Sequence, residues 1–351
     1  MKEEQSSLSE PQELFEHHRF IVDKGQTPLR IDKYLLLKLA HTSRTKIQNA
    51  AEGGNILLNG KTTRASYKVK PLDEITILLP HPPKNFEIIA EDLPIDILYE
   101  DDDILIVNKS AGMVVHPAFG HDRGTLVNVL HFHFSNLPVG VSKVAEGIYA
   151  PRPGLVHRID KNTTGILIVA KHEFALQKLA RKFYDHDLER KYLAIVWGTP
   201  NPLQGTIRFN IGRSIKDRKV MESFPEGGNG KRAITHYKLL ENFGLVSLLE
   251  CKLETGRTHQ IRAHLKAMGT PVFNDEQYGG NIIKKGNLTA SYKQFIQNCF
   301  EICGRQALHA ASLKIEHPVT GEIMLFKCDL PSDMNDLLTK WRKYSHGKAQ
   351  G

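Results

Sequence analysis

The residues best suited to chemistry lie in a short polar segment enclosed by apolar ones. The apolar pair 155–156 precedes the polar segment 157–164, and Gly165 then opens the β-branched run 166–170. A run of this composition predicts a buried strand. We therefore expect the polar segment to be held against a hydrophobic core.

Asp160 lies in this segment between Arg158 and Lys161. Neighbouring cations lower the pKa of a carboxyl group, so Asp160 is expected to stay ionised and to be available as a nucleophile or a charge partner. The segment also fits a purely structural role, because Asx and Thr side chains hydrogen-bond their own backbone in tight turns. Composition alone leaves both interpretations open.

The order His-Arg-Ile-Asp-Lys-Asn-Thr-Thr-Gly, followed by an apolar strand, resembles the signature of the RluA/RluD-type pseudouridine synthases. That signature is usually written His-Arg-Leu-Asp-x-x-Thr-Ser-Gly, so Ile159 and Thr164 are mild departures from it. The resemblance implies that Asp160 is the catalytic residue. It also implies that Arg158 is the side chain that enters the RNA helix when the target base leaves its stack.

Tyr192 opens a predicted strand over residues 191–197. A half-buried tyrosine at a strand start is ordinary. The string Arg-Lys-Tyr-Leu-Ala-Ile-Val nevertheless resembles the family element Lys-x-Tyr-x-Ala-x-Val, in which the tyrosine stands beside the aspartate. The resemblance therefore makes Tyr192 a candidate catalytic residue.

Arg262 lies in a predicted helix that Thr258 is expected to cap and whose apolar stripe faces the core. A buried arginine needs a carboxylate or phosphate partner, and Asp160 is the candidate. The surrounding string resembles the family motif Thr-Gly-Arg-x-His-Gln-Ile-Arg, whose last arginine pairs with the catalytic aspartate. Its first arginine, Arg257, is expected to bind RNA.

No metal site is predicted. His259 and His264 are five residues apart, a spacing that does not bring them to one face of a helix. The four cysteines show no spacing typical of a zinc site or of a secreted disulfide framework; they are Cys251, Cys299, Cys303 and Cys328.

Residues 108–117, Asn-Lys-Ser-Ala-Gly-Met-Val-Val-His-Pro, resemble a further family motif. Lys109 precedes Gly112, which gives the backbone freedom. Lys109 is therefore either an RNA phosphate contact or an exposed lysine at a strand end. The segment 201–231 is predicted to be a mobile basic hairpin or loop, which would either follow the RNA backbone or be a solvated surface.

The pattern of residues 27–79 indicates a small, basic module of two helices and a small sheet. Ser43 is expected to cap its second helix, and Asn59-Gly60 is typical of a hairpin turn. Between residues 24 and 70 there are ten basic side chains and two acidic ones, an excess that equals the formal charge of the whole chain, +8. Arg44 and Lys46 are predicted phosphate contacts, with a solvated helix face as the alternative. The sequence resembles the S-four RNA-binding module.

The chain has 351 residues, of which 40% are hydrophobic. Its positive charge favours a polyanionic partner without establishing one. The polar N-terminus does not read as a signal peptide, and no apolar run reaches the roughly 18 residues of a membrane span, so we expect a soluble cytoplasmic protein.

The resemblances imply an α+β chain in five parts. The catalytic domain is expected to contain a mixed, mainly antiparallel sheet flanked by helices and loops. The expected parts are a disordered acidic tail over 1–22, an S-four-like module over 23–80, a linker over 81–94, the catalytic domain over 95–341 and a tail over 342–351.

The implied activity is conversion of uridine to pseudouridine in RNA by base flipping, cleavage of the glycosidic bond and reattachment at carbon 5. The implied substrate is large-subunit ribosomal RNA or the assembling subunit. A monomer without metal or organic cofactor would suffice. Three alternatives stay open: a non-catalytic RNA-binding or ribosome-assembly factor, a pseudouridine synthase acting on transfer RNA, and a nucleoside hydrolase using the same aspartate.

Overall fold

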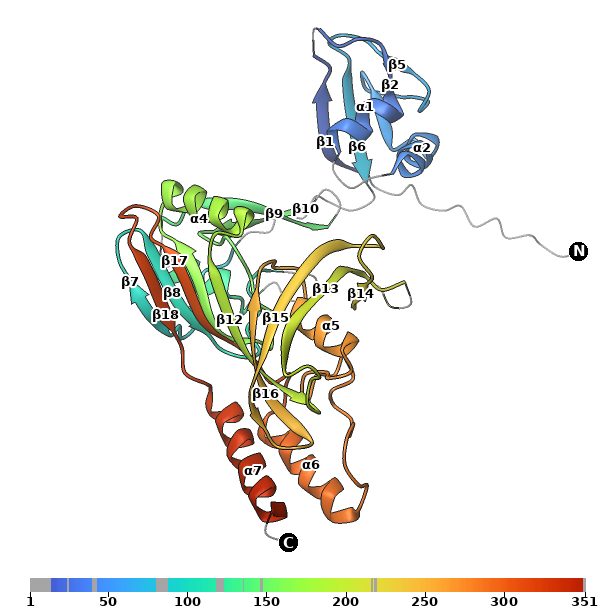
Figure 1. Ribbon diagram of the computed structural model, residues 1–351. Coiled ribbons are helices and arrows are strands. Elements are labelled where there is room, and N and C mark those ends of the chain that lie inside the picture. The colour runs from blue at the N-terminus through green and yellow to red at the C-terminus, as the bar shows by residue number, and fades with distance from the viewer. Residues whose placement is uncertain are drawn as a thin grey trace, which may run out of the picture. The chain divides into compact units, whose positions relative to one another are not determined.

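The computed structural model describes residues 14–23, 25–39, 43–79, 88–117, 123–134, 136–145, 148–215, 217 and 220–349, and the chain divides into two compact units (Figure 1). The first unit comprises residues 1–87 with 141–151, and the second comprises residues 88–140 with 152–351. In the part of the chain that is described, no helix is both long and apolar enough to cross a membrane.

A four-stranded antiparallel sheet and two helices build the first unit. The strand order is β1-β6-β3-β4, while β2 and β5 pair with each other. Ile31 and Ile47 from the helices pack with Ile75 from the sheet in one core. The elements are β1 (Phe15–Ile21), β2 (Leu29–Arg30), α1 (Ile31–Lys38), α2 (Arg44–Glu52), β3 (Ile56–Leu58), β4 (Lys61–Thr62), β5 (Lys68–Val69) and β6 (Glu74–Leu79).

Two local predictions for this unit are confirmed. The Ser43 hydroxyl accepts a hydrogen bond from the Lys46 backbone N–H at 3.3 Å and so caps α2. Asn59 and Gly60 have φ values of 50° and 78°. Positive φ at both positions is what a two-residue type I′ hairpin requires.

The predicted acidic tail over residues 1–22 is wrong at its C-terminal end. Residues 15–21 form β1, which pairs with β6, and Val22 is fully buried in the core of the unit. This strand lies at the edge of its sheet, where few apolar residues are needed, so its composition looked like that of a disordered segment. Residues 1–13 lie outside the described part of the chain.

A ten-stranded sheet forms the frame of the second unit (Figure 1). Its order is β14-β13-β15-β16-β12-β17-β11-β8-β7, with β18 also paired to β17. All paired neighbours are antiparallel except β11 and β17, so the expected mixed, mainly antiparallel sheet is confirmed. The strands are β7 (Ile97–Glu100), β8 (Ile104–Lys109), β11 (Thr164–Ala170), β12 (Glu189–Trp197), β13 (Gln204–Arg213), β14 (Met221–Phe224), β15 (Lys231–Asn242), β16 (Val246–Leu253), β17 (Leu308–Glu316) and β18 (Ile323–Lys327).

Helices cover both faces of this sheet. Ile166 and Ile168 of β11 share a core with α4, whereas Leu167 and Val169 share another with α3 and α5. This alternation is the period-2 pattern of a strand buried on both faces, as predicted for residues 166–170. The helices are α3 (Leu126–His133), α4 (Glu173–Asp185), α5 (Gln260–Ala267), α6 (Ala290–Ile302) and α7 (Ser332–Ala349); β9 (Val139–Ala145) and β10 (Ile148–Pro153) pair with each other.

Two further segments differ from their predicted form. Residues 88–94 are not linker, because Asn128 of α3 donates its side-chain amide to the Ile89 carbonyl at 2.8 Å. Residues 342–349 are not tail, because they continue α7 and the Tyr344 ring stacks on Phe295. The segment 201–231 contains β13 and β14, which pair in antiparallel orientation, so the hairpin predicted there is confirmed. The basic residues Lys216, Arg218 and Lys219 lie outside the described residues.

Candidate active site

Asp160 lies in the loop that leads into β11 and lines a pocket of about 680 Å³. Its backbone carbonyl accepts a hydrogen bond from the Thr163 N–H at 3.1 Å, which closes a tight turn. Its carboxylate is 19% exposed and points to Arg262. The backbone of Asp160 therefore makes the turn, while its side chain stays available to the pocket.

Arg262 joins two carboxylates in the interior. Its Nη1 donates to Asp160 Oδ2 at 3.0 Å, which confirms the predicted pairing. Its Nε and Nη2 donate to Asp275 Oδ2 and Oδ1 at 2.7 and 2.9 Å, and Nη2 also donates to Gln277 Oε1 at 2.9 Å. The guanidinium lies 4.8 Å from the centre of the Tyr278 ring.

These contacts keep Arg262 charged. Burial by itself would lower its pKa, but the carboxylates of Asp275 and Asp160 outweigh burial and raise it. Asp275 is fully buried and holds Arg262 through two of its nitrogens, so it orients the cation that faces Asp160. Sequence reasoning missed Asp275, although a buried arginine next to a single carboxylate invites the search for a second one.

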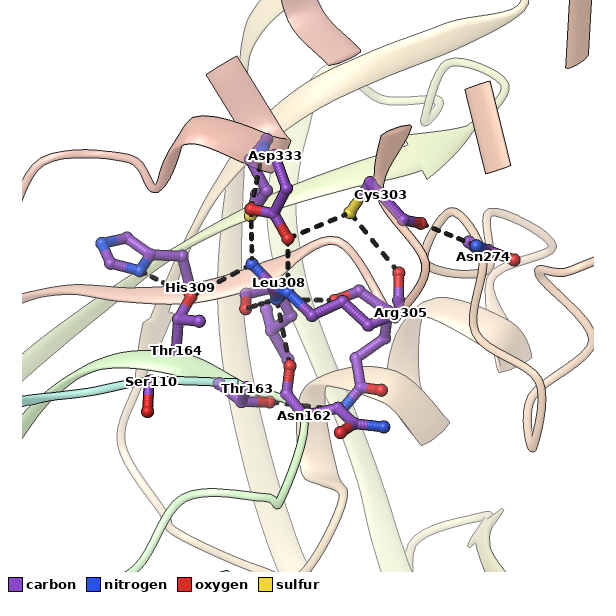
Figure 2. A network of polar contacts seen from close by, with 12 residues as sticks. Ser110, Asn162, Thr163, Thr164, Asn274, Cys303, Arg305, Leu308, His309 and Asp333 are labelled. Carbon is purple, nitrogen blue, oxygen red and sulfur yellow. Dashed lines mark hydrogen bonds and ion pairs between the residues drawn. The ribbon is translucent and has the colours of Figure 1, made fainter. Parts of the chain in front are cut away.

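Two buried cations hold the backbone that follows Asp160. Arg305 donates from Nη1 to the Asn162 carbonyl at 3.0 Å, and its Nε and Nη2 bind the Asp333 carboxylate at 2.7 and 3.0 Å. Figure 2 shows Arg305 between Asp333 and the strand start at Thr164, whose hydroxyl is bonded to His309 at 2.9 Å. The loop is thus tied to residues near the C-terminal end of the chain.

Lys109 is the second of these cations, and its predicted RNA contact is wrong. It is 2% exposed, and its Nζ donates to the carbonyls of Ser110, Met113 and Lys161 at 2.7, 3.0 and 2.9 Å. All three donors of the protonated amine are therefore used inside the protein, while burial, and then the charge of Arg305, lower its pKa to about 7. The alternative, an exposed lysine at a strand end, is equally wrong.

Tyr192 and Asp160 line the same pocket. Tyr192 follows a register shift in the pairing of β12 with β17, an irregularity that re-aims a strand side chain. Burial raises the pKa of the Tyr192 phenol; the charge of Arg190 opposes this rise and that of Asp160 adds to it. The phenol therefore stays protonated at neutral pH.

His259 is a pocket residue that sequence reasoning considered only as a metal ligand. It occupies the N-cap position of α5 in a left-handed conformation, with φ of 54°, so the expected cap at Thr258 is wrong. Its Nδ1 is hydrogen-bonded to the Tyr278 hydroxyl at 3.0 Å, and its Nε2 lies 3.8 Å from Asp160 Oδ1. His259 thereby borders the carboxylate oxygen that Arg262 leaves open.

Among the described residues, one set of side chains has the spacing of metal ligands, and none of its members lines the pocket. This set is Asp101, Asp103 and His317. His317 Nε2 is hydrogen-bonded to Asp101 Oδ2 at 3.1 Å, and its Nδ1 accepts the Thr320 N–H at 3.1 Å. Both imidazole nitrogens are therefore engaged in hydrogen bonds within the protein.

The predicted RNA contacts fall into two groups. Arg158 and Arg257 line the pocket, where Arg158 is exposed and Arg257 donates from Nε to the Arg232 carbonyl at 3.1 Å. Arg44 and Lys46 lie on the first turn of α2 in the first unit, and both are exposed.

Arg44 also has a structural partner. Its Nε donates to Asp32 Oδ2 at 2.9 Å, and Arg30 binds the same fully buried carboxylate. Hydrogen bonds from Arg30, and then from Arg44, hold the pKa of Asp32 well below its usual range despite burial. Because the Arg44 side chain is still 47% exposed, it presents charge to solvent as well.

Comparison with protein families gives two matches. Residues 103–267 match the RNA pseudouridylate synthase family, and residues 29–75 match the S4 domain. The first match contains Lys109, Asp160, Tyr192 and Arg262, and the second contains both Arg44 and Lys46.

Relatives of known name are similar over most of the chain. An "Uncharacterized RNA pseudouridine synthase" of Chlorobaculum parvum is 47% identical, over 92% of this chain and 96% of that protein. The "Ribosomal large subunit pseudouridine synthase D" of Zymomonas mobilis is 40% identical, over 87% of this chain and 91% of that protein. The solved structure "Human RNA Pseudouridylate Synthase Domain Containing 1" is 25% identical, with a TM-score of 0.50, over 74% of this chain and 97% of that one.

Proposed function

This chain belongs to the RNA pseudouridylate synthase family, and from that premise we propose that Asp160 is the catalytic carboxylate of an enzyme that isomerises uridines of large-subunit ribosomal RNA. One observation carries the proposal: among the described residues that line the pocket, Asp160 is the only carboxylate, and Arg262 orients it at 3.0 Å. The ribosomal target is supported by what the name of the Zymomonas relative says of that protein.

The reaction needs a carboxylate at the sugar of the target nucleotide. The bond between C1′ and N1 breaks, the uracil turns, a bond between C1′ and C5 forms, and the proton of C5 is lost while N1 gains one. An ionised carboxylate can assist by attacking C1′ or by removing a sugar proton. Asp160 Oδ2 is engaged by Arg262, which leaves Oδ1 as the reacting oxygen.

Tyr192 and Arg158 have supporting roles in this proposal. A phenol whose pKa is raised by burial is a poor base at neutral pH, so Tyr192 is assigned to stacking on the displaced uracil. Arg158 is exposed at the pocket and fills the gap in the RNA stack. Flipping costs a few kcal/mol of unstacking, which contacts to RNA offset.

Arg44 and Lys46 of the first unit are proposed to contact RNA phosphates. Each contact to a single strand contributes about 0.7 to the slope of log affinity against log salt. Lys46→Gln should therefore lower that slope by about 0.7, whereas Lys340→Gln on α7 should leave it unchanged. Equal slopes for Lys46→Gln and the unaltered protein would remove Lys46 from the RNA-binding surface.

We further propose that the monomer is the active form and that it needs neither a metal nor an organic cofactor. Asp160, Tyr192 and Arg262, to which this proposal assigns the reaction, line one pocket of a single chain, so the proposed chemistry needs no residue from a second copy. The net reaction is an isomerisation, so no electrons must be supplied. The four cysteines are free thiols, in keeping with the predicted cytoplasmic location.

The deciding experiment compares the unaltered protein, Asp160→Asn and, as a matched control, Asp336→Asn on the exposed face of α7. Purified proteins would be assayed for tritium release from ribosomal RNA labelled at C5 of uridine, and for RNA binding. Asp160→Asn should lose the product and keep the affinity, while the control keeps both. Turnover by Asp160→Asn would overturn the assignment, and release of free uracil would indicate a hydrolase instead.

The substrate is tested in cells. Pseudouridine mapping of total RNA would compare cells with the gene intact, deleted or carrying Asp160→Asn. Sites in large-subunit ribosomal RNA should be lost in both altered strains. Loss confined to transfer RNA would overturn the proposed substrate while leaving the activity intact.

A further inference from the structure

The pocket carries far more positive than negative charge. Five arginines line it, against one carboxylate, Asp160. They are Arg152, Arg158, Arg190, Arg257 and Arg262. Arg262 is neutralised by two carboxylates, but none of the other four forms an ion pair within the described part of the chain. The charge of the pocket therefore fits a ligand that carries more than one anionic group.

Arg190 is the most unusual of these cations. It is the second residue of β12 and is only 8% exposed, yet its Nε is buried without a hydrogen-bond partner, and it forms no ion pair with a carboxylate among the described residues. Its guanidinium lies 5.4 Å from the centre of the Phe183 ring. A buried charge without a counter-charge is costly, and this cost lowers the pKa of Arg190. Such a side chain gains a partner when a ligand supplies one.

Gly256 leaves room for this guanidinium. A Cβ atom placed on Gly256 would lie 2.8 Å from Arg190 Nη1. Gly256 does not adopt a positive φ, so its backbone conformation would accept other residues. Glycine at position 256 is therefore explained by the space that the Arg190 guanidinium occupies and not by the conformation of the backbone.

Arg257 follows Gly256 directly and brings a second cation to this wall of the pocket. His186, Arg190 and Arg257 line the same pocket. Desolvation lowers the pKa of His186, the charges of Arg190 and Arg257 lower it further, and those of Glu254 and Asp185 oppose them. Arg257 has one backbone acceptor, the Arg232 carbonyl, and no carboxylate partner among the described residues. Two carboxylates of the same neighbourhood, Glu254 and Asp185, pair with His236 and Arg181. Arg190 and Arg257 thus line one wall of the pocket, and neither forms an ion pair among the described residues.

We propose that Arg190 and Arg257 form a binding site for a backbone phosphodiester of the RNA strand that carries the target uridine. The proposal rests on the proposed function, because it takes RNA as the ligand of this pocket. Guanidinium groups bind phosphate oxygens through charge-assisted hydrogen bonds, often in pairs. A phosphate held here fixes the strand beside Asp160 and Tyr192, which line the same pocket.

The proposal predicts opposite effects of one substitution on the free protein and on the complex. Arg190→Met keeps an unbranched side chain that ends near the position of the arginine Nε, and it removes the unpaired charge. The RNA-free protein should therefore melt at the same temperature as the unaltered one or higher. RNA affinity should fall about 10- to 100-fold, as expected for a lost hydrogen bond to a charged group. The slope of log affinity against log salt should fall by about 0.7.

Arg181→Met is the matched control, because Arg181 lies on the exposed side of α4 with its side chain 74% exposed. It should change neither the RNA affinity nor its salt dependence. Arg190→Lys keeps a cation and should recover part of the affinity. It also keeps the test decisive if Arg190→Met does not fold.

Binding is measured in an Asp160→Asn background, so that turnover does not consume the RNA. Reduced melting temperature together with unchanged affinity for Arg190→Met would make Arg190 a structural residue and overturn the proposal. Inorganic phosphate that stabilises the unaltered protein but not Arg190→Met, with equal RNA affinity for both, would indicate a free-anion site and also overturn it. Failure of the unaltered protein to isomerise RNA would instead refute the proposed function.

Discussion

Asp275→Asn should weaken both the fold and the reaction, although Asp275 is separated from the substrate by Arg262. Asp275 neutralises Arg262 through two hydrogen bonds, of 2.7 and 2.9 Å. An asparagine there keeps one acceptor oxygen and turns an NH₂ group toward the donors of Arg262. Removal of one partner from a buried ion pair typically costs about 3–5 kcal/mol, and we expect a loss of unfolding free energy in this range.

The catalytic effect follows from the position of Arg262. Without the second carboxylate, the guanidinium is no longer fixed along the line that leads to Asp160 Oδ2. A displacement of about 1 Å in a reacting group can reduce turnover roughly 100-fold. We expect kcat of Asp275→Asn to fall by about this factor at saturating RNA.

The assay pairs urea unfolding with tritium release under saturating RNA. Glu241→Gln is the matched control, since Glu241 binds Arg342 through two similar hydrogen bonds, of 2.8 and 2.7 Å, at a half-exposed site. Exposed pairs contribute about 0–1 kcal/mol, so the control should unfold nearly like the unaltered protein and retain its kcat. Equal stability and equal kcat for Asp275→Asn would refute the argument that Asp275 holds the catalytic pair in place.

Two further predictions follow. Lys109→Met should lower the unfolding free energy by about 3 kcal/mol or more and reduce kcat, because three buried carbonyls lose their donor; urea unfolding as in the unaltered protein would contradict this. Burial lowers the pKa values of His116, His157 and His264 to about 3, 3 and 4. In the unfolded chain these side chains have an ordinary pKa of about 6.5, so below this pH the unfolded chain binds more protons than the folded one. Stability should therefore fall as the pH drops from about 6.5 to 4, by about 2 kcal/mol per histidine at pH 5, and a flat pH profile of urea midpoints would contradict it.

Local chemistry made part of the structure predictable. The Ser43 cap, the Asn59-Gly60 hairpin and the buried strand β11 each depend on neighbours in sequence, so their patterns are visible without the fold. The pairing of Asp160 with Arg262 was predictable because a buried arginine demands an anion.

The remaining errors share one cause, which is dependence on distant partners. Lys109 looked exposed because nothing near it in sequence indicates that the Lys161 carbonyl would cover it. Arg305 and Asp275 depend in the same way on residues brought close by the fold. The edge strand β1 was missed because its pairing partner, β6, lies more than 50 residues further along the chain.

The tie between the Asp160 loop and the C-terminal residues has a consequence for the newly made chain. Asp333, which holds Arg305 against the loop, is synthesised 173 residues after Asp160. At about 5–20 residues per second, this interval is roughly 10–35 seconds of translation. During that time the chain has Asp160 but lacks the Arg305–Asp333 contact that holds the loop after it. This contact can therefore form only after Asp333 has been made, so products truncated before Asp333 lack it.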